Sequence, residues 1–102
     1  MKVLHVDQAS FNQLKESEKP VLLDFFAPWC GPCKLLSPIV DRLAEEHEEY
    51  VFAKVNVDEE GALADAFGIR SVPTLVVLKG GRETARRIGA ANAAGILSLL
   101  ES

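Results

Sequence analysis

The chain has 102 residues, of which 48% are hydrophobic and 25% are charged. This composition is average for a globular protein, and the length suits one domain over residues 1–102 with one core. Eleven basic against fifteen acidic residues give a formal charge of −4, which argues against nucleic acid as a partner. No export signal and no run long enough to span a membrane is seen, so the expectation is a cytoplasmic monomer without membrane contact.

Strand and helix patterns alternate from the N-terminus. Polar and apolar side chains alternate over 2–6 and predict a short strand, and the spacing of Phe11 and Leu14 suggests a short helix after it. The apolar run over 21–27 has the length of a strand and predicts a buried central one. Asp24 is the only charged residue within this run.

The rest of the chain continues the alternation and ends differently. Apolar residues at the spacing i, i+3, i+4 and i+7 predict an amphipathic helix from about residue 33 to residue 49. Further patterns predict a strand, a helix, two strands and a last helix, over 51–57, 61–67, 74–78, 84–88 and from Asn92 onward. Gly80 and Gly81 are typical of a β-hairpin turn, so the last two strands should be antiparallel. This order predicts an α/β fold, with a mixed sheet covered by helices on both faces.

The two cysteines, Cys30 and Cys33, lie where a predicted strand meets a predicted helix. The backbone N–H groups and the dipole at a helix N-terminus stabilise a thiolate, so Cys30 is the expected nucleophile. Cys33, one turn inside the helix, is expected to be more buried and to attack the mixed disulfide that Cys30 forms with a substrate. Gly31 leaves room for that substrate, and Pro32 suits the first turn of a helix. The spacing therefore predicts thiol–disulfide exchange.

A cysteine pair of this kind has two other uses. A C-x-x-C pair supplies two of the four ligands of a zinc site, but His5 and His47, the remaining nitrogen ligands, lack the spacing of a metal knuckle. No metal is expected. A purely structural disulfide is disfavoured in a reducing compartment, and one this short would close no useful loop.

The chain resembles the thioredoxin family in the run Trp29-Cys30-Gly31-Pro32-Cys33, with Asp24-Phe25 before it and Lys34 and Pro38 after it. The likeness extends over nearly the whole chain, through Lys54, Asp58, Val72-Pro73-Thr74, Gly80-Gly81 and Gly89. It implies the thioredoxin fold: a central five-stranded mixed sheet in the order 1-3-2-4-5, flanked by four helices. Helices 1 and 3 would cover one face of the sheet, and helices 2 and 4 the other.

The resemblance also implies a surface for substrates. The peptide bond before Pro73 would be cis and would place the Val72 backbone beside the sulfurs. The docking surface would consist of small or apolar residues, namely Trp29, Gly31, Pro32, Val72, Pro73, Gly89 and Ala90. By themselves, Gly89 also fits a simple turn and Trp29 a core aromatic residue.

The acid in the central strand has two interpretations. An isolated carboxylate among apolar residues is costly to ionise, and Asp24 could be a hydrogen-bonded core acid. The family likeness instead implies that Asp24 accepts and donates the proton of Cys33, with Lys54 near enough to modulate it. Because perturbed acids concentrate at active sites, the functional interpretation is favoured.

The implied function is a general protein-disulfide reductase that binds no cofactor. It would act on disulfide-containing proteins and be re-reduced by an NADPH-dependent thioredoxin reductase. An oxidase or isomerase of the same fold and a non-enzymatic binding subunit remain as alternatives. The Gly31-Pro32 pair favours the reductant, and the intact cysteines with Asp24 argue against a mere binding module.

Two positions depart from the family pattern. Phe26 stands where most bacterial members have tryptophan, and Pro28 stands where an acidic or other polar residue is common. Phe26 is expected to fill a core position. Pro28 is expected to change the charge at the rim of the site and the choice of partner.

Overall fold

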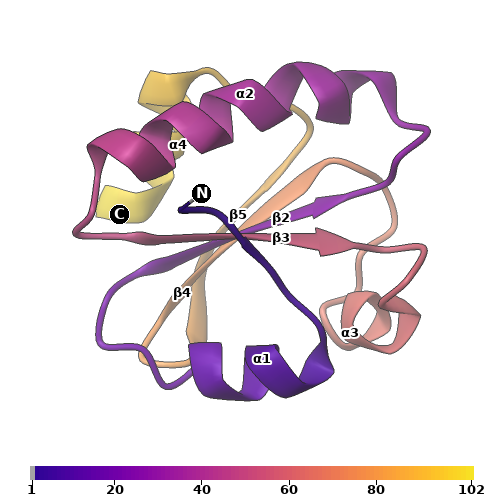
Figure 1. The fold of residues 1–102 in the computed structure, drawn as a ribbon, viewed down its shortest axis with the longest axis horizontal. Helices are drawn as coiled ribbons and strands as arrows, with labels where there is room; N and C mark the ends of the chain where they lie inside the picture. The colour runs from indigo at the N-terminus through magenta and orange to yellow at the C-terminus, as the bar shows by residue number, and fades with distance from the viewer. Residues whose placement is uncertain (1) are drawn as a thin grey trace.

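The computed structural model describes residues 2–102, which form five strands and four helices (Figure 1). The strands are β1 (Leu4–His5), β2 (Val21–Phe26), β3 (Val51–Asn56), β4 (Thr74–Lys79) and β5 (Arg82–Ile88). The helices are α1 (Gln8–Leu14), α2 (Gly31–Glu46), α3 (Gly61–Ala66) and α4 (Ala93–Glu101). The predicted order of elements is confirmed.

The strands form one mixed sheet in the order β1-β3-β2-β4-β5. The pairs β1–β3 and β2–β3 are parallel, while β2–β4 and β4–β5 are antiparallel. Gly80 and Gly81 join β4 to β5 with φ values of +59° and +80°. Positive φ at both central residues is what a two-residue hairpin of type I′ requires, and glycine adopts it without strain. The predicted topology and hairpin are confirmed.

Two layers of helices cover the sheet, α2 and α4 on one face and α1 and α3 on the other (Figure 1). Side chains alternate between the two faces of a strand, so β2 contributes to both layers. Leu22 packs with residues of α2 and α4, whereas Leu23 and Phe25 pack with residues of α1 and α3. Asp24 shares the face of Leu22. The central strand therefore directs its one carboxylate toward α2.

The helix α2 begins earlier and ends earlier than predicted. Cys30 is its N-cap, with extended backbone angles, and Pro32 occupies the first turn, where a missing N–H costs little. The predicted extension to residue 49 is wrong, since the helix ends at Glu46. Leu43 and Ala44 are its last buried residues. Acidic residues follow at positions 45, 46, 48 and 49, and negative charge is unfavourable at a helix C-terminus.

The start of α4 provides a test of the fold. Asn92 is the N-cap, as predicted, and its side chain accepts a hydrogen bond from the Gly95 N–H at 2.8 Å. Asn92→Ala should lower the free energy of unfolding by about 1 kcal/mol, because one helix N–H loses its partner. Asn92→Ser keeps an accepting oxygen and should retain most of that stability. Equal denaturant midpoints for the wild type and Asn92→Ala would show that the cap does not stabilise α4.

Candidate active site

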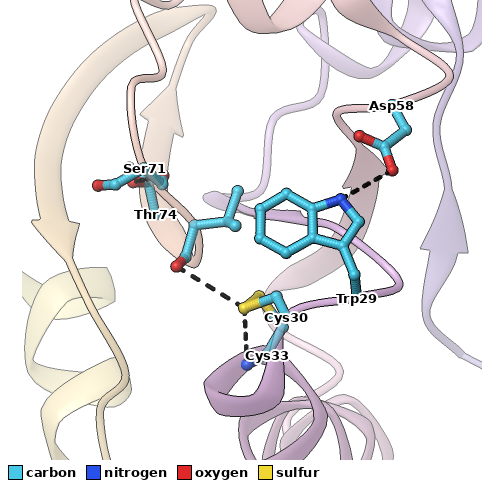
Figure 2. The surroundings of a disulfide bond; sticks show 7 residues. Trp29, Cys30, Cys33, Asp58, Ser71 and Thr74 are labelled. Atoms are coloured by element: carbon cyan, nitrogen blue, oxygen red, sulfur yellow. Dashed lines mark hydrogen bonds between the residues drawn. A yellow bond between two sulfur atoms is a disulfide. The ribbon is translucent and has the colours of Figure 1, made fainter.

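The two cysteines form a disulfide at the junction of β2 and α2, with their Cα atoms 5.3 Å apart. Cys30 has the N-cap position, and its Sγ accepts a hydrogen bond from the Cys33 backbone N–H at 3.2 Å (Figure 2). A sulfur in this position faces the unpaired N–H groups and the positive end of the helix dipole. In the reduced protein, this arrangement favours a thiolate at Cys30.

Burial does not distinguish the two cysteines, contrary to the prediction. Both residues are 4% exposed. The loop before β4 lies against Cys30, with the Val72 carbonyl oxygen 3.7 Å from its Sγ. The two residues differ in their surroundings instead. Cys30 faces the Val72 carbonyl, whereas Cys33 lines a partly open cavity that Asp24 also lines.

Two loops lie beside the disulfide. The Val72–Pro73 peptide bond is cis, as predicted, and the Gly89 N–H donates to the Pro73 carbonyl oxygen at 2.8 Å. Gly89 has a φ of +98°, a conformation that favours glycine, so this turn itself requires glycine here. Ala90, Gly31 and Pro32 are exposed. Of the other residues predicted to dock a substrate, Val72 and Gly89 are half-buried, and Pro73 is buried, so Pro73 offers little surface to a substrate.

Trp29 lies on the surface and is not a core residue. It is 70% exposed, and its Nε1–H donates to Asp58 Oδ2 at 3.1 Å (Figure 2). The indole borders a hollow of about 150 Å³ that is otherwise lined by Val57, Ile69, Arg70, Ser71 and Val72. The hydrogen bond fixes the ring beside the loop of Val72. Sequence reasoning noted Asp58 as a family position but did not foresee this contact.

Asp24 is 1% exposed, and its Oδ1 has no hydrogen-bond partner among the described residues. The carboxyl group borders a cavity of about 190 Å³ together with Cys33. Burial raises the pKa of Asp24 to about 6, while the nearby Lys54 lowers it and the charge of Asp41 raises it. The interpretation of Asp24 as a fully hydrogen-bonded core acid does not account for the unpartnered oxygen. A base that titrates close to neutral pH stands beside Cys33.

Lys54 is the neighbour of Asp24 in the register of β3 and β2 and is 8% exposed. Its ammonium group donates to Ser37 Oγ and, at 2.9 Å, to Asp41 Oδ1. Lys54 therefore acts on Asp24 through its charge, while its hydrogen bonds go to α2. Sequence reasoning missed Ser37 and Asp41. Ser37 lies four residues after Cys33, and Asp41 lies four residues after Ser37, so this spacing on the predicted helix is the signal that could have found them.

The two departures from the family pattern lie at the edge of this site. Phe26 is half-buried and packs against Ala27 and the cysteines, and it lines the cavity of Asp24. Pro28 is exposed and borders the same cavity. Both therefore line the opening of the Asp24 cavity.

Within residues 2–102, no three His, Cys, Asp or Glu side chains gather as a metal site would require. No helix in the same range has the length and apolarity to cross a membrane.

Comparisons with known proteins agree with this site. The thioredoxin family model matches residues 2–102. A thioredoxin of Haemophilus influenzae is 47% identical over 90 residues, which is 86% of this chain and 84% of that protein. A thioredoxin of Pyropia yezoensis is 44% identical over 102 residues, 98% of this chain and 95% of that protein.

A solved structure gives the same result for the fold. A mutant thioredoxin from Halobacterium salinarum has a TM-score of 0.92 and 39% identity, covering 98% of this chain and 88% of that one. Three findings agree: the family model spans the described residues, the relatives are similar over most of their length, and the two cysteines form a disulfide. The chain belongs to the thioredoxin family and is a thiol–disulfide oxidoreductase.

Proposed function

We propose that the protein is a general reductant of protein disulfides, in which Cys30 attacks, Cys33 resolves and Asp24 transfers the proton. The observation that carries this proposal is the asymmetry around the disulfide. Cys30 is at the helix N-terminus beside the exposed Trp29, Gly31 and Pro32. Cys33 lines the cavity of the unpartnered Asp24. One sulfur is thus placed to meet a substrate, and the other to receive help from a base.

The first step uses the thiolate of Cys30. It attacks one sulfur of the substrate disulfide, forms a mixed disulfide and releases the other substrate sulfur as a thiolate. A substrate segment lying along the loop before β4 could pair with the Val72 backbone, whose carbonyl oxygen is 3.7 Å from Cys30 Sγ. Trp29, Gly31, Pro32, Gly89 and Ala90 would contact the substrate around it.

The second step regenerates the structure described above. Cys33 loses its proton to the Asp24 carboxylate and attacks Cys30 Sγ, which forms the Cys30–Cys33 disulfide and releases the second substrate thiolate. Two electrons pass from the dithiol to the substrate. With a pKa of about 6, Asp24 is mostly ionised at pH 7, so it can accept this proton and then pass it to solvent or to a leaving thiolate. Lys54 modulates that basicity through its charge.

The cycle needs a reductant and a compartment. We propose that an NADPH-dependent thioredoxin reductase restores the dithiol, and that disulfide-containing proteins are the substrates. We place this cycle in the cytoplasm, because that compartment keeps thiols reduced.

The assay of this proposal is the reduction of a disulfide protein, driven by NADPH and a thioredoxin reductase. NADPH consumption that depends on this chain supports the proposal, and none above the rate with Cys30→Ser contradicts it.

Trapping of intermediates tests the order of the two sulfurs. Cys33→Ser should accumulate mixed disulfides with protein substrates, because the thiol that resolves them is gone. Cys30→Ser is the matched control and should trap little, since its remaining cysteine is buried in the wall of the cavity beside Asp24. Non-reducing electrophoresis measures both. Equal trapping by the two variants would contradict the assignment of Cys30 as the nucleophile.

Asp24 links stability to function. Its folded-state pKa of about 6 is above the unfolded value of ~3.9, so between these values the folded chain holds the extra proton. Stability therefore falls as pH rises through this window, by about 2–3 kcal/mol at pH 7. Asp24→Ala removes this cost and should be more stable than the wild type at pH 7, with the gain gone near pH 4. It should also reduce substrates at least about tenfold more slowly, because the base is lost.

Denaturant melts at pH 7 and pH 4, alongside the reductase assay, measure both effects. Asp65→Ala is the control, since this exposed carboxylate should change stability little at either pH. An Asp24→Ala variant that is less stable than the wild type at pH 7, or equally fast in turnover, would assign Asp24 a structural role only.

A further inference from the structure

The side of α2 that carries Cys33 also carries the two groups that hold Lys54. Cys33, Ser37 and Asp41 follow one another at intervals of four residues, so they lie along one side of the helix. Lys54 donates to Ser37 Oγ and to Asp41 Oδ1. Its ammonium group is thereby tied to the helix, although its neighbour in the register of the sheet is Asp24.

We propose that Asp41, assisted by Ser37, positions Lys54 and so sets how strongly the ammonium group acts on Asp24. The inference rests on the proposed function, in which Asp24 takes the proton of Cys33. An ammonium group within about 4–6 Å stabilises an ionised carboxylate. When the same group is bound by a second carboxylate, part of its charge is neutralised and its hydrogen bonds are already used. Asp41 thus keeps Lys54 from pairing with Asp24.

Several charged or titratable groups face Asp24. Its cavity is lined by His5 of β1, Lys54 of β3, and Cys33 and Lys34 of α2. Asp41 is the group that reaches Asp24 in two ways, through its own charge and through its ion pair with Lys54. The Asp41 side chain is 45% exposed, against 9% for that of Lys54. Asp41 can therefore be replaced without opening the core. It is the partly exposed member of the group, whereas Asp24 and Lys54 are buried.

Loss of the Asp41 charge acts on Asp24 in one direction by both routes. The repulsion between the two carboxylates disappears, which favours the ionised form of Asp24. Lys54 is also released from its ion pair and can approach Asp24 Oδ1, which has no hydrogen-bond partner among the described residues. Both effects make Asp24 a weaker base toward Cys33.

The test follows the Asp24 carboxyl carbon by NMR as pH is varied. The oxidised protein is used, because its disulfide removes the titration of both thiols. In Asp41→Asn, the Asp24 midpoint should fall by about one pH unit, because a repulsive charge is lost and Lys54 is released toward Asp24. Ser37→Ala removes one of the two anchors and should shift the midpoint in the same direction by less. The ring resonances of His5 are followed in the same samples, so that its titration is separated from that of Asp24.

Glu45→Gln is the matched control. It removes the same charge from the same helix one turn further on, at an exposed residue whose charge acts on Lys2. Its Asp24 midpoint should equal that of the wild type. An unchanged or raised midpoint in both Asp41→Asn and Ser37→Ala would overturn the inference, and so would an equal shift in Glu45→Gln. A loss of stability without a shift would assign Asp41 a structural role and also overturn it.

A second measurement separates this inference from the proposed function. The pH dependence of substrate reduction is recorded for the wild type, Asp41→Asn and Glu45→Gln. A rate profile that moves to lower pH together with the Asp24 midpoint supports both the positioning of Lys54 and proton transfer by Asp24. A shifted Asp24 midpoint with an unshifted rate profile supports the positioning by Asp41 and contradicts the role of Asp24 in the reaction.

Discussion

The burial of Asp24 without a full set of hydrogen bonds is the constraint on which the rest of the site depends. A carboxylate in the middle of a central strand is expensive to ionise, and a chain selected for stability alone would place an apolar residue there. The alternation of β2 turns this side chain toward α2, where the cavity of Cys33 receives it. The same desolvation that costs stability raises the pKa of Asp24 to about 6, into the range useful for accepting a proton at neutral pH.

The two cysteines use opposite ends of the same short segment. Cys30 is the last residue of the extended segment that follows β2, and its Sγ accepts a hydrogen bond from the Cys33 backbone N–H at 3.2 Å. Cys33 is already helical and belongs to the side of α2 that faces the sheet. Since both residues are 4% exposed in the disulfide, the different roles proposed for them rest on orientation and not on depth. In the proposed cycle, the helix N-terminus stabilises charge on the sulfur of Cys30, and the buried Asp24 removes a proton from Cys33.

Much of this arrangement could be predicted from the sequence, because strong local patterns carry it. A few neighbouring residues determine each of these patterns: the apolar run of β2, the helical spacing on α2 and the Gly80-Gly81 turn. The cysteine motif indicated the family. The end of α2 was placed three residues too late, because periodicity does not show where apolar contact stops. The relative burial of the cysteines was wrong for another reason. The loop that covers Cys30 comes from Val72, which is distant in the sequence.

The contacts of Lys54 could not be predicted for a similar reason. The family resemblance implied that Lys54 lies near Asp24, and the register of β3 and β2 agrees. Its hydrogen bonds to Ser37 and Asp41 depend on how α2 packs over the sheet. A charged group beside a buried acid invites the assumption of a direct pair. Here the Lys54 ammonium group forms its ion pair with Asp41 of α2, and Asp24 Oδ1 has no hydrogen-bond partner among the described residues. Tertiary packing therefore sets the chemistry of two residues that sequence analysis had placed side by side.

The central claim is that Asp24 takes the proton of Cys33 when the mixed disulfide is resolved. The most direct measurement loads Cys30 with a chromogenic aromatic thiol as a mixed disulfide and follows its release by stopped-flow absorbance as pH is varied. In the wild type, the rate of release should rise with a midpoint near the pKa of Asp24, about 6. In Asp24→Asn, release should be slower at neutral pH, and that midpoint should disappear from the profile. Superimposable profiles for the two proteins would contradict the account.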